Sequence, residues 1–189
     1  MATVGTVKEN AVGVLGGTFD PVHNAHLAIA RAALDQLQLE RILWLPTGSP
    51  KYREPARTPA AHRVAMLKLA IEGEPRYAID ERELAPGHSG YTVDTLKSLG
   101  GRPVLLLGAD QYAKFETWHR WREILGLARI AVFARPGWSA PDARAQFMPM
   151  PPLDISASDI RARLARGEDV SAQVPAKVLD YIRQHRLYR

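Results

Sequence analysis

The chain has 189 residues, of which 46% are hydrophobic, and its 25 Lys and Arg against 20 Asp and Glu give a formal net charge of +5. These values are typical of one globular domain with anionic partners, and they exclude a disordered or fibrous chain. The absence of cysteine excludes disulfides, a thiolate zinc site and a cysteine nucleophile; since the apolar runs are also too short to span a bilayer, we expect a soluble, cytoplasmic protein.

Short apolar runs alternate with helical patterns along the chain. Residues 12–15 predict a strand that ends in two glycines, and apolar residues at helical spacing predict a helix from Asn24 onward. Residues 42–45 predict the second strand. Thr58 and Pro59 predict the N-cap and first turn of a helix that continues to Ile71.

The same alternation continues to the C-terminus. Further strands are predicted at residues 77–82, 103–107, 130–134 and 147–150, and further helices at residues 92–99, 120–127, 158–166 and from about 175 onward. This order predicts an α/β fold, a Rossmann-like doubly wound parallel sheet with helices on both faces and a small C-terminal helical region. Without internal repeats or a convincing linker, residues 1–189 are predicted to form a single domain.

Residues 16–26, with the sequence GGTFDPVHNAH, carry the strongest indication of chemistry. The glycines let backbone N–H groups approach an anion closely, and the helix N-terminus that follows adds unpaired N–H groups and the positive end of the helix dipole. His23 and His26 are three residues apart, so both side chains lie on one face of the first helical turn. This combination favours the binding of phosphate.

Other interpretations of the two histidines stay open at this point. One histidine can cap the helix while the other is satisfied in the core. A metal pair would need a third ligand, which is not evident nearby, and the glutamate of the zinc protease helix is absent. The segment also lacks the glycine spacing of the dinucleotide fingerprint and the Gly-Lys-Ser/Thr ending of a P-loop, which argues against a nucleoside triphosphatase of that type.

Residues 155–161, with the sequence ISASDIR, predict a second anion site at a helix start. Ser158 is a natural N-cap, and Arg161, one turn into the helix, can donate two hydrogen bonds to a phosphate. The alternative is a routine helix cap with a solvated arginine.

Three further loops follow predicted strands and carry polar groups. Asp110 can accept hydrogen bonds from ribose hydroxyls, and Lys51 and Arg135 can meet phosphate or stack on a base, although cations in loops are commonly just solvated. Trp118 and Trp121 lie near the start of a predicted helix, where an indole either packs in the core or stacks on an aromatic ring of a ligand.

Together these segments resemble the nucleotidyltransferase superfamily with a His-x-x-His signature, and within it the bacterial nicotinate mononucleotide adenylyltransferases. The stretches that carry the resemblance are GGTFDPVHNAH (16–26), DERELAPGHSGYTVDTL (80–96), LGADQYAKFETWHRW (107–121), ARPG (134–137), ISASDIR (155–161) and the terminal LYR. They run through nearly the whole chain. One departure is Ala25, where the family usually has glycine, and we expect it to be tolerated because alanine is small and suits a helix.

The resemblance implies roles for individual residues. It implies that His23, His26 and Arg161 are the catalytic residues. It implies that ATP is bound by Gly16, Gly17, Thr18, Phe19, His26, Gly108, Asp110, Arg135, Ser156, Ser158 and Arg161. Around nicotinate mononucleotide it implies Thr18, Lys51, Tyr91, Thr92 and Trp118, with the Trp118 indole stacked on the pyridine ring.

The reaction that the resemblance implies is adenylyl transfer from ATP to nicotinate mononucleotide, which yields nicotinate adenine dinucleotide and pyrophosphate in NAD biosynthesis. Mg²⁺ would arrive with ATP, because no carboxylate cluster suggests a metal held by the protein. The alternatives are nicotinamide mononucleotide or phosphopantetheine as acceptor, or a nucleotide- or RNA-binding protein without catalysis. We expect no membrane and no nucleic acid as partner, and the sequence leaves open whether the chain forms a homo-oligomer.

Overall fold

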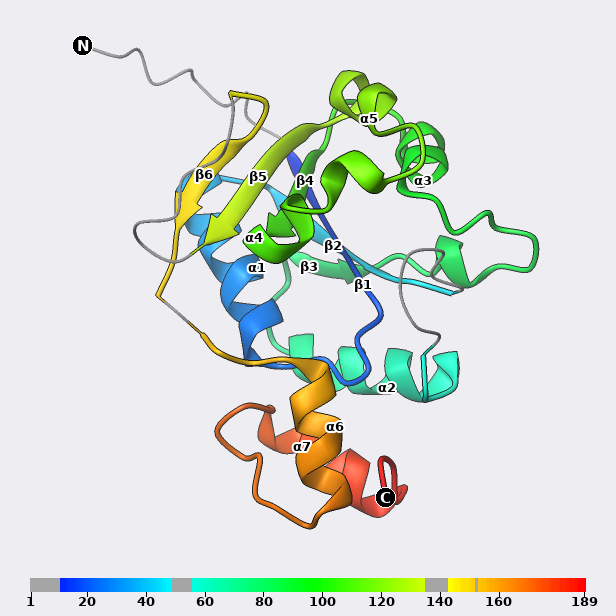
Figure 1. The fold of residues 1–189 in the computed structure, drawn as a ribbon, viewed down its shortest axis with the longest axis vertical. Coiled ribbons are helices and arrows are strands. Elements are labelled where there is room, and N and C mark those ends of the chain that lie inside the picture. The colour runs from blue at the N-terminus through cyan, green and yellow to red at the C-terminus, as the bar shows by residue number, and fades with distance from the viewer. Residues whose placement is uncertain (1–10, 49–55, 135–142, 152) are drawn as a thin grey trace.

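The computed structural model describes residues 11–48, 56–134, 143–151 and 153–189. Its six described strands form one parallel sheet in the order β3-β2-β1-β4-β5-β6 (Figure 1). The strands are β1 (Val12–Gly17), β2 (Arg41–Pro46), β3 (Tyr77–Ile79), β4 (Val104–Gly108), β5 (Arg129–Ala134) and β6 (Gln146–Pro149). The chain builds outward from β1 to β3, returns to the other side of β1 and builds outward again, which confirms the predicted doubly wound fold.

Helices cover both faces of the sheet. One hydrophobic cluster takes residues from α1 (Asn24–Leu37), α2 (Ala60–Ile71), α6 (Ala157–Ala165) and α7 (Ala176–Gln184). A second takes residues from α3 (Thr92–Leu99), α4 (Ala109–Tyr112) and α5 (Trp121–Leu127). In β4, Leu106 joins the first cluster while Leu105 and Leu107 join the second, because successive strand residues point to opposite faces. Burial on both faces explains why the strands are continuous apolar runs.

Two helix starts differ from the prediction. Thr58 is not the N-cap of α2, which begins at Ala60 after Pro59, because the Thr58 backbone serves buried tertiary hydrogen bonds instead. The N-cap of α6 is Ser156, not Ser158; the Ser156 hydroxyl accepts a hydrogen bond from the Asp159 N–H at 3.2 Å. Helix α6 therefore starts nearer to β6 than predicted.

The strand predicted over residues 77–82 is shorter, since β3 ends at Ile79. The Asp80 carboxylate accepts a hydrogen bond from the Arg82 N–H at 3.1 Å, and a 3₁₀ turn follows over Arg82–Leu84. This local turn ends the sheet edge. The remaining predicted strands and helices are present within one or two residues of their predicted limits.

The sheet topology places an opening at one end of the molecule. Strand β1 lies between β2 and β4, whose connecting helices lie on opposite faces of the sheet, so a crevice forms outside the carboxyl ends of β1 and β4. Helices α6 and α7 form the lower end of the molecule in Figure 1, with the C-terminus beside them. Among the described helices, none has the length and apolar character needed to cross a membrane. The assignment of the whole chain to a single domain stays a prediction.

Candidate active site

A cleft of about 950 Å³ lies at the carboxyl ends of β1 and β4. Its walls come from the turn after β1, from β4 and α4, from the end of β5 and from the segment that leads into α6. The residues predicted around ATP that the structure describes all line this cleft: Gly16, Gly17, Thr18, Phe19, His26, Gly108, Asp110, Ser156, Ser158 and Arg161. Arg135 lies outside the described residues.

Gly16 and Gly17, at the end of β1, lack a side chain for different structural reasons. A Cβ at Gly17 would lie 2.9 Å from the Phe19 ring, so packing leaves no room for a side chain there. In the described part of the chain, a Cβ at Gly16 would meet no atom within 4 Å apart from those of its two neighbours, and Gly16 lines the cleft. The missing side chain at Gly16 therefore leaves room for a ligand. The Phe19 ring itself is buried and supports the His26 imidazole edge-on, with ring centroids 5.0 Å apart.

His23 and His26 line the cleft at the N-terminus of α1. Their rings stack with centroids 3.8 Å apart. The Nδ1 of His26 accepts a hydrogen bond from the His23 backbone N–H at 3.3 Å, so a neutral His26 carries its ring proton on Nε2. Burial lowers the pKa of His23 to about 4, so its imidazole is neutral at pH 7. A neutral His23 can donate one N–H to an anion without charge repulsion between the stacked rings.

Arg161 connects α6 to the turn after β1. Its Nη1 donates to the Asp20 carbonyl at 2.8 Å, and its Nη2 donates to the Ser158 hydroxyl at 3.3 Å. Its Nε is buried and has no hydrogen-bond partner within the described part of the chain. A buried donor without a partner is costly, so this N–H is suited to a ligand that supplies an acceptor.

Asp110 lies at the start of α4, directly after β4. A Cβ at Gly108 would lie 2.8 Å from the Asp110 Oδ1, so the carboxylate folds back over Gly108 and would have to turn away to admit a side chain there. Gln111 and Lys114 also line the cleft. Neither was predicted from the sequence: Gln111 lies in α4, which has only four residues and no hydrophobic period of its own, and Lys114 lies beyond the end of that helix.

A smaller cavity of about 90 Å³ adjoins the cleft and reaches toward the N-terminus of α3. Of the residues predicted around nicotinate mononucleotide, Thr18, Thr92 and Trp118 line it. Tyr91 stacks on His119 with ring centroids 4.2 Å apart, and His119 lines the same cavity. Lys51 lies outside the described residues.

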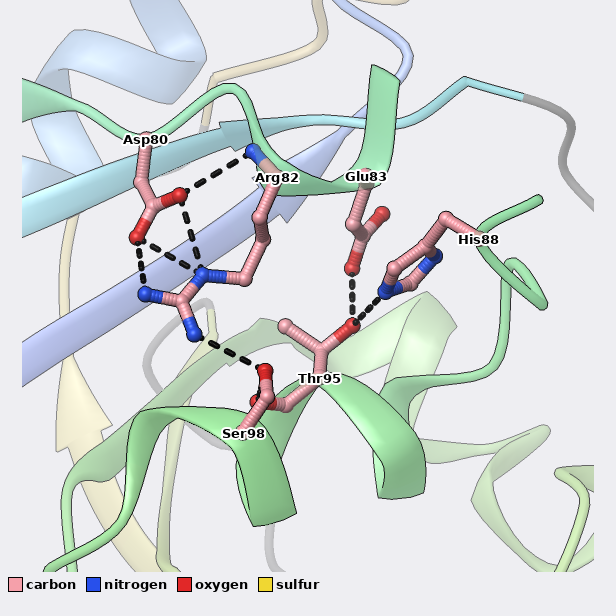
Figure 2. A network of polar contacts seen from close by, with 6 residues as sticks. All are labelled: Asp80, Arg82, Glu83, His88, Thr95 and Ser98. Carbon is pink, nitrogen blue, oxygen red and sulfur yellow. Dashed lines mark hydrogen bonds and ion pairs between the residues drawn. The ribbon is translucent and has the colours of Figure 1, made fainter. Parts of the chain in front are cut away.

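A chain of hydrogen-bonded side chains holds the wall of the smaller cavity in place (Figure 2). Thr95, which is buried in α3, donates to the Glu83 carboxylate at 2.7 Å and lies 3.4 Å from the His88 Nε2. The His88 Nδ1 accepts from the Gly90 N–H at 3.1 Å, so in a neutral His88 the proton is on Nε2 and points to Thr95. This chain ties the loop before α3 to the helix, and so holds the Tyr91 and Thr92 backbone in place.

The two tryptophans have different surroundings. Trp118 lines both cavities and packs on Phe115 with ring centroids 5.7 Å apart. Trp121 packs on Phe115 as well, but Arg122 and Arg144 lie over its ring at 4.5 and 5.1 Å from the centroid. Trp118 is therefore the indole placed to meet a ligand.

Arg63 was not predicted from the sequence; it supports the site from behind and is not among the described residues that line the two cavities. It is 2% exposed, and its guanidinium donates to the carbonyls of Thr18 at 2.6 Å, Thr47 at 2.9 Å and Thr58 at 3.1 Å. Burial lowers the pKa of Arg63, while the charge of Asp20 acts in the opposite direction. Arg63 thus joins the ends of β1 and β2. The available signal was an arginine in phase with the buried Val64 and Leu67 face of α2.

Comparisons with known proteins agree with this geometry. The profile of the cytidylyltransferase-like family matches residues 14–163. A protein of Laribacter hongkongensis is 45% identical over 95% of this chain and 94% of its own length, and one of Bordetella petrii is 46% identical over 94% and 98%; both are named probable nicotinate-nucleotide adenylyltransferase. The chain belongs to the nicotinate-nucleotide adenylyltransferase family. This confirms the resemblance seen in the sequence.

A solved structure extends the likeness of the fold. The nicotinic acid mononucleotide adenylyltransferase of Plasmodium falciparum, complexed with NaAD, aligns with a TM-score of 0.78 over 95% of this chain and 98% of its own. Its sequence identity is 19%, so the likeness concerns the fold alone.

Ala25 is where this member departs from the glycine usual in the adenylyltransferase family. It is the second residue of α1 and lines the cleft. The extra methyl group therefore lies at the wall of the cleft, in a helix that alanine favours.

Gly16 provides the first test of the cleft. We expect Gly16→Ala to leave the melting temperature unchanged, because the new methyl group clashes with no described residue. We expect it to lower kcat/KM about tenfold or more, because the methyl group occupies ligand space. Gly126→Ala in α5 is the matched control, since its Cβ also meets no atom within 4 Å. An active Gly16→Ala enzyme would contradict close approach of a ligand at this glycine.

The buried His23 predicts a pH dependence of stability. Its pKa is lowered from 6.5 to about 4, so the unfolded state binds a proton below pH 6.5 that the folded state does not. The contribution of the neutral His23 to stability is therefore fully present above pH 6.5. The free energy of unfolding then falls by up to about 3 kcal/mol as the pH drops to 4. Urea unfolding of the wild type and of His23→Asn should show a smaller loss in the variant over this range; equal losses would contradict a neutral buried His23.

Proposed function

We propose that this protein transfers the adenylyl group of ATP to nicotinate mononucleotide, which yields nicotinate adenine dinucleotide and pyrophosphate, as a step of NAD biosynthesis in the cytoplasm. The observation that carries the proposal is that the two cavities meet at the turn after β1. The residues that they share are Gly16, Gly17, Thr18, Leu107, Gln111 and Trp118. Two ligands bound side by side would bring their phosphates together at this turn.

In this reaction a phosphate oxygen of the mononucleotide attacks the α-phosphorus of ATP, and pyrophosphate leaves in line. No protein nucleophile is needed, so the protein's task is to position two substrates and to stabilise negative charge. His23 and His26 would donate N–H groups to the α- and β-phosphates. Arg161 would meet the pyrophosphate with the donor that is unpartnered in the described residues. The N-termini of α1 and α6 would add their dipoles.

The side chains around the phosphate region suit an anion better than a resident metal. In the described ranges, no group of three or more His, Asp or Glu side chains is arranged to hold a metal ion. We propose that Mg²⁺ enters bound to the triphosphate, as part of the substrate Mg·ATP, and neutralises charge on the pyrophosphate.

The decisive experiment measures pyrophosphate release from Mg·ATP with nicotinate mononucleotide, nicotinamide mononucleotide and phosphopantetheine in parallel. We expect release with the nicotinate acceptor to exceed release with the other two. A preference for another acceptor would keep adenylyl transfer and overturn the substrate. Absence of release with all three would overturn the proposed reaction.

The phosphate-binding side chains give a prediction on turnover. His26→Ala and Arg161→Ala should each lower kcat by about 100-fold or more, because each removes a donor to charge that develops in the transition state. Arg163→Ala is the matched control for α6, since Arg163 binds Glu168 and the Asp169 carbonyl. Steady-state kinetics and circular dichroism on all three variants check this, and near-normal turnover of His26→Ala or Arg161→Ala would contradict the assignment.

Trp118 gives a prediction on acceptor binding. Trp118→Ala should raise the KM for nicotinate mononucleotide about tenfold with a smaller change in the KM for ATP, because the stacking surface for the pyridine ring is lost. Trp121→Ala, which removes an indole covered by arginines, is the control. If both variants lose only thermal stability, Trp118 is a packing residue and not a ligand contact.

A further inference from the structure

Tyr188, which follows the end of α7 by four residues, makes a hydrogen bond to the turn after β1. Its hydroxyl donates to the Asp20 Oδ1 at 2.6 Å. Its ring packs against the hydrophobic cluster that includes residues of α1, α2, α6 and α7. Asp20 is 3% exposed, and its other oxygen accepts from the Arg57 N–H at 2.7 Å. The tyrosine therefore supplies a donor to a carboxylate that water barely reaches.

The tail reaches Asp20 through a reversal of the chain after α7. The Leu187 N–H donates back to the Ile182 carbonyl at 3.0 Å, and Arg186 and Tyr188 have φ values of 52° and 63°. Side chains other than glycine rarely adopt this left-handed conformation, because the Cβ crowds the backbone. The conformation persists because the Tyr188 ring and hydroxyl gain contacts that offset its cost.

Asp20 also joins this tail to the cleft. The Asp20 carbonyl accepts the Arg161 Nη1 at 2.8 Å, and Asp20 lies only three residues before His23, the N-cap of α1. The carboxylate and the carbonyl of one residue thus connect the C-terminal tail, α6 and the start of the histidine helix.

We propose that Tyr188 is a positioning residue for adenylyl transfer: through the Asp20 carboxylate it fixes the segment that carries Thr18, His23 and His26 and the carbonyl that orients Arg161. This inference rests on the proposed function. Tyr188 does not line either cavity, as far as the described residues define them, so its effect passes through Asp20. A carboxylate that loses this donor shifts toward other partners, and the turn after β1 shifts with it.

Tyr188→Phe removes the hydroxyl and keeps the ring. We expect kcat to fall about tenfold, because the free energy of a hydrogen bond to a charged group corresponds to a rate change of about this size. The KM for nicotinate mononucleotide should stay unchanged. Tyr181→Phe is the matched control, because its hydroxyl pairs with the His62 Nδ1 at 2.9 Å in the same C-terminal region and does not contact Asp20. This control should keep kcat and show a comparable change in melting temperature.

A double-mutant cycle with Asp20→Asn separates positioning from packing. If Tyr188 acts through Asp20, adding Tyr188→Phe to Asp20→Asn lowers kcat little further. Additive effects, a wild-type kcat in Tyr188→Phe, or equal kcat losses in the Tyr188 and Tyr181 variants would each overturn the inference.

Calorimetric titration with Mg·ATP tests the positioning role of Tyr188 independently of the proposed reaction. If the wild type turns over none of the acceptors, the proposed function fails, and weaker Mg·ATP binding by Tyr188→Phe than by wild type and Tyr181→Phe still supports positioning. Equal Mg·ATP affinities in that case would overturn it.

Discussion

The buried hydrogen bonds around Thr18 and Asp20 are the constraint on which the site depends. The turn between β1 and α1 has to hold Thr18 and the two imidazoles at the start of α1 in place beside the cleft, although its own residues lie outside both elements. Arg63 binds the Thr18 carbonyl, and Asp20 receives donors from Arg57, Arg161 and Tyr188. Buried polar groups of a turn are costly unless they are paired, so the turn is held in one conformation by elements from both ends of the chain.

The same contacts limit the positive charge along the cleft. Arg63 and Arg161 are held on carbonyl oxygens, and the Asp20 carboxylate is close enough to Arg63 to act on its pKa. His23 adds no positive charge at pH 7 because burial lowers its pKa. The cleft therefore does not bring several uncompensated cations together, and its donors are held in place by the protein, which is the condition for electrostatic catalysis of the proposed transfer.

Local patterns in the sequence were enough for most of the fold and for the residues that line the cleft. Strands buried on both faces appear as apolar runs, and helices that cover them appear as apolar residues at helical spacing. The cap of α6 was placed two residues late, because Ser156 and Ser158 are equally good caps in sequence and only the hydrogen bond to Asp159 distinguishes them. The end of β3 was missed because Arg82 binds Asp80 locally.

The roles of Arg63 and Tyr188 could not be found in this way, because their partners are distant in sequence; the phase of Arg63 in α2 indicates only that it is buried. Arg63 reaches a carbonyl 45 residues earlier, and Tyr188 reaches a carboxylate 168 residues earlier. A backbone carbonyl leaves no signal in the sequence, and a tyrosine near a chain end looks the same whether its hydroxyl is solvated or buried. The groups that contact a ligand occur in local motifs, since a turn and a helix start are local structures. The groups that hold those motifs in place are fixed by tertiary packing, and they decide the geometry that the turn after β1 presents to the cleft.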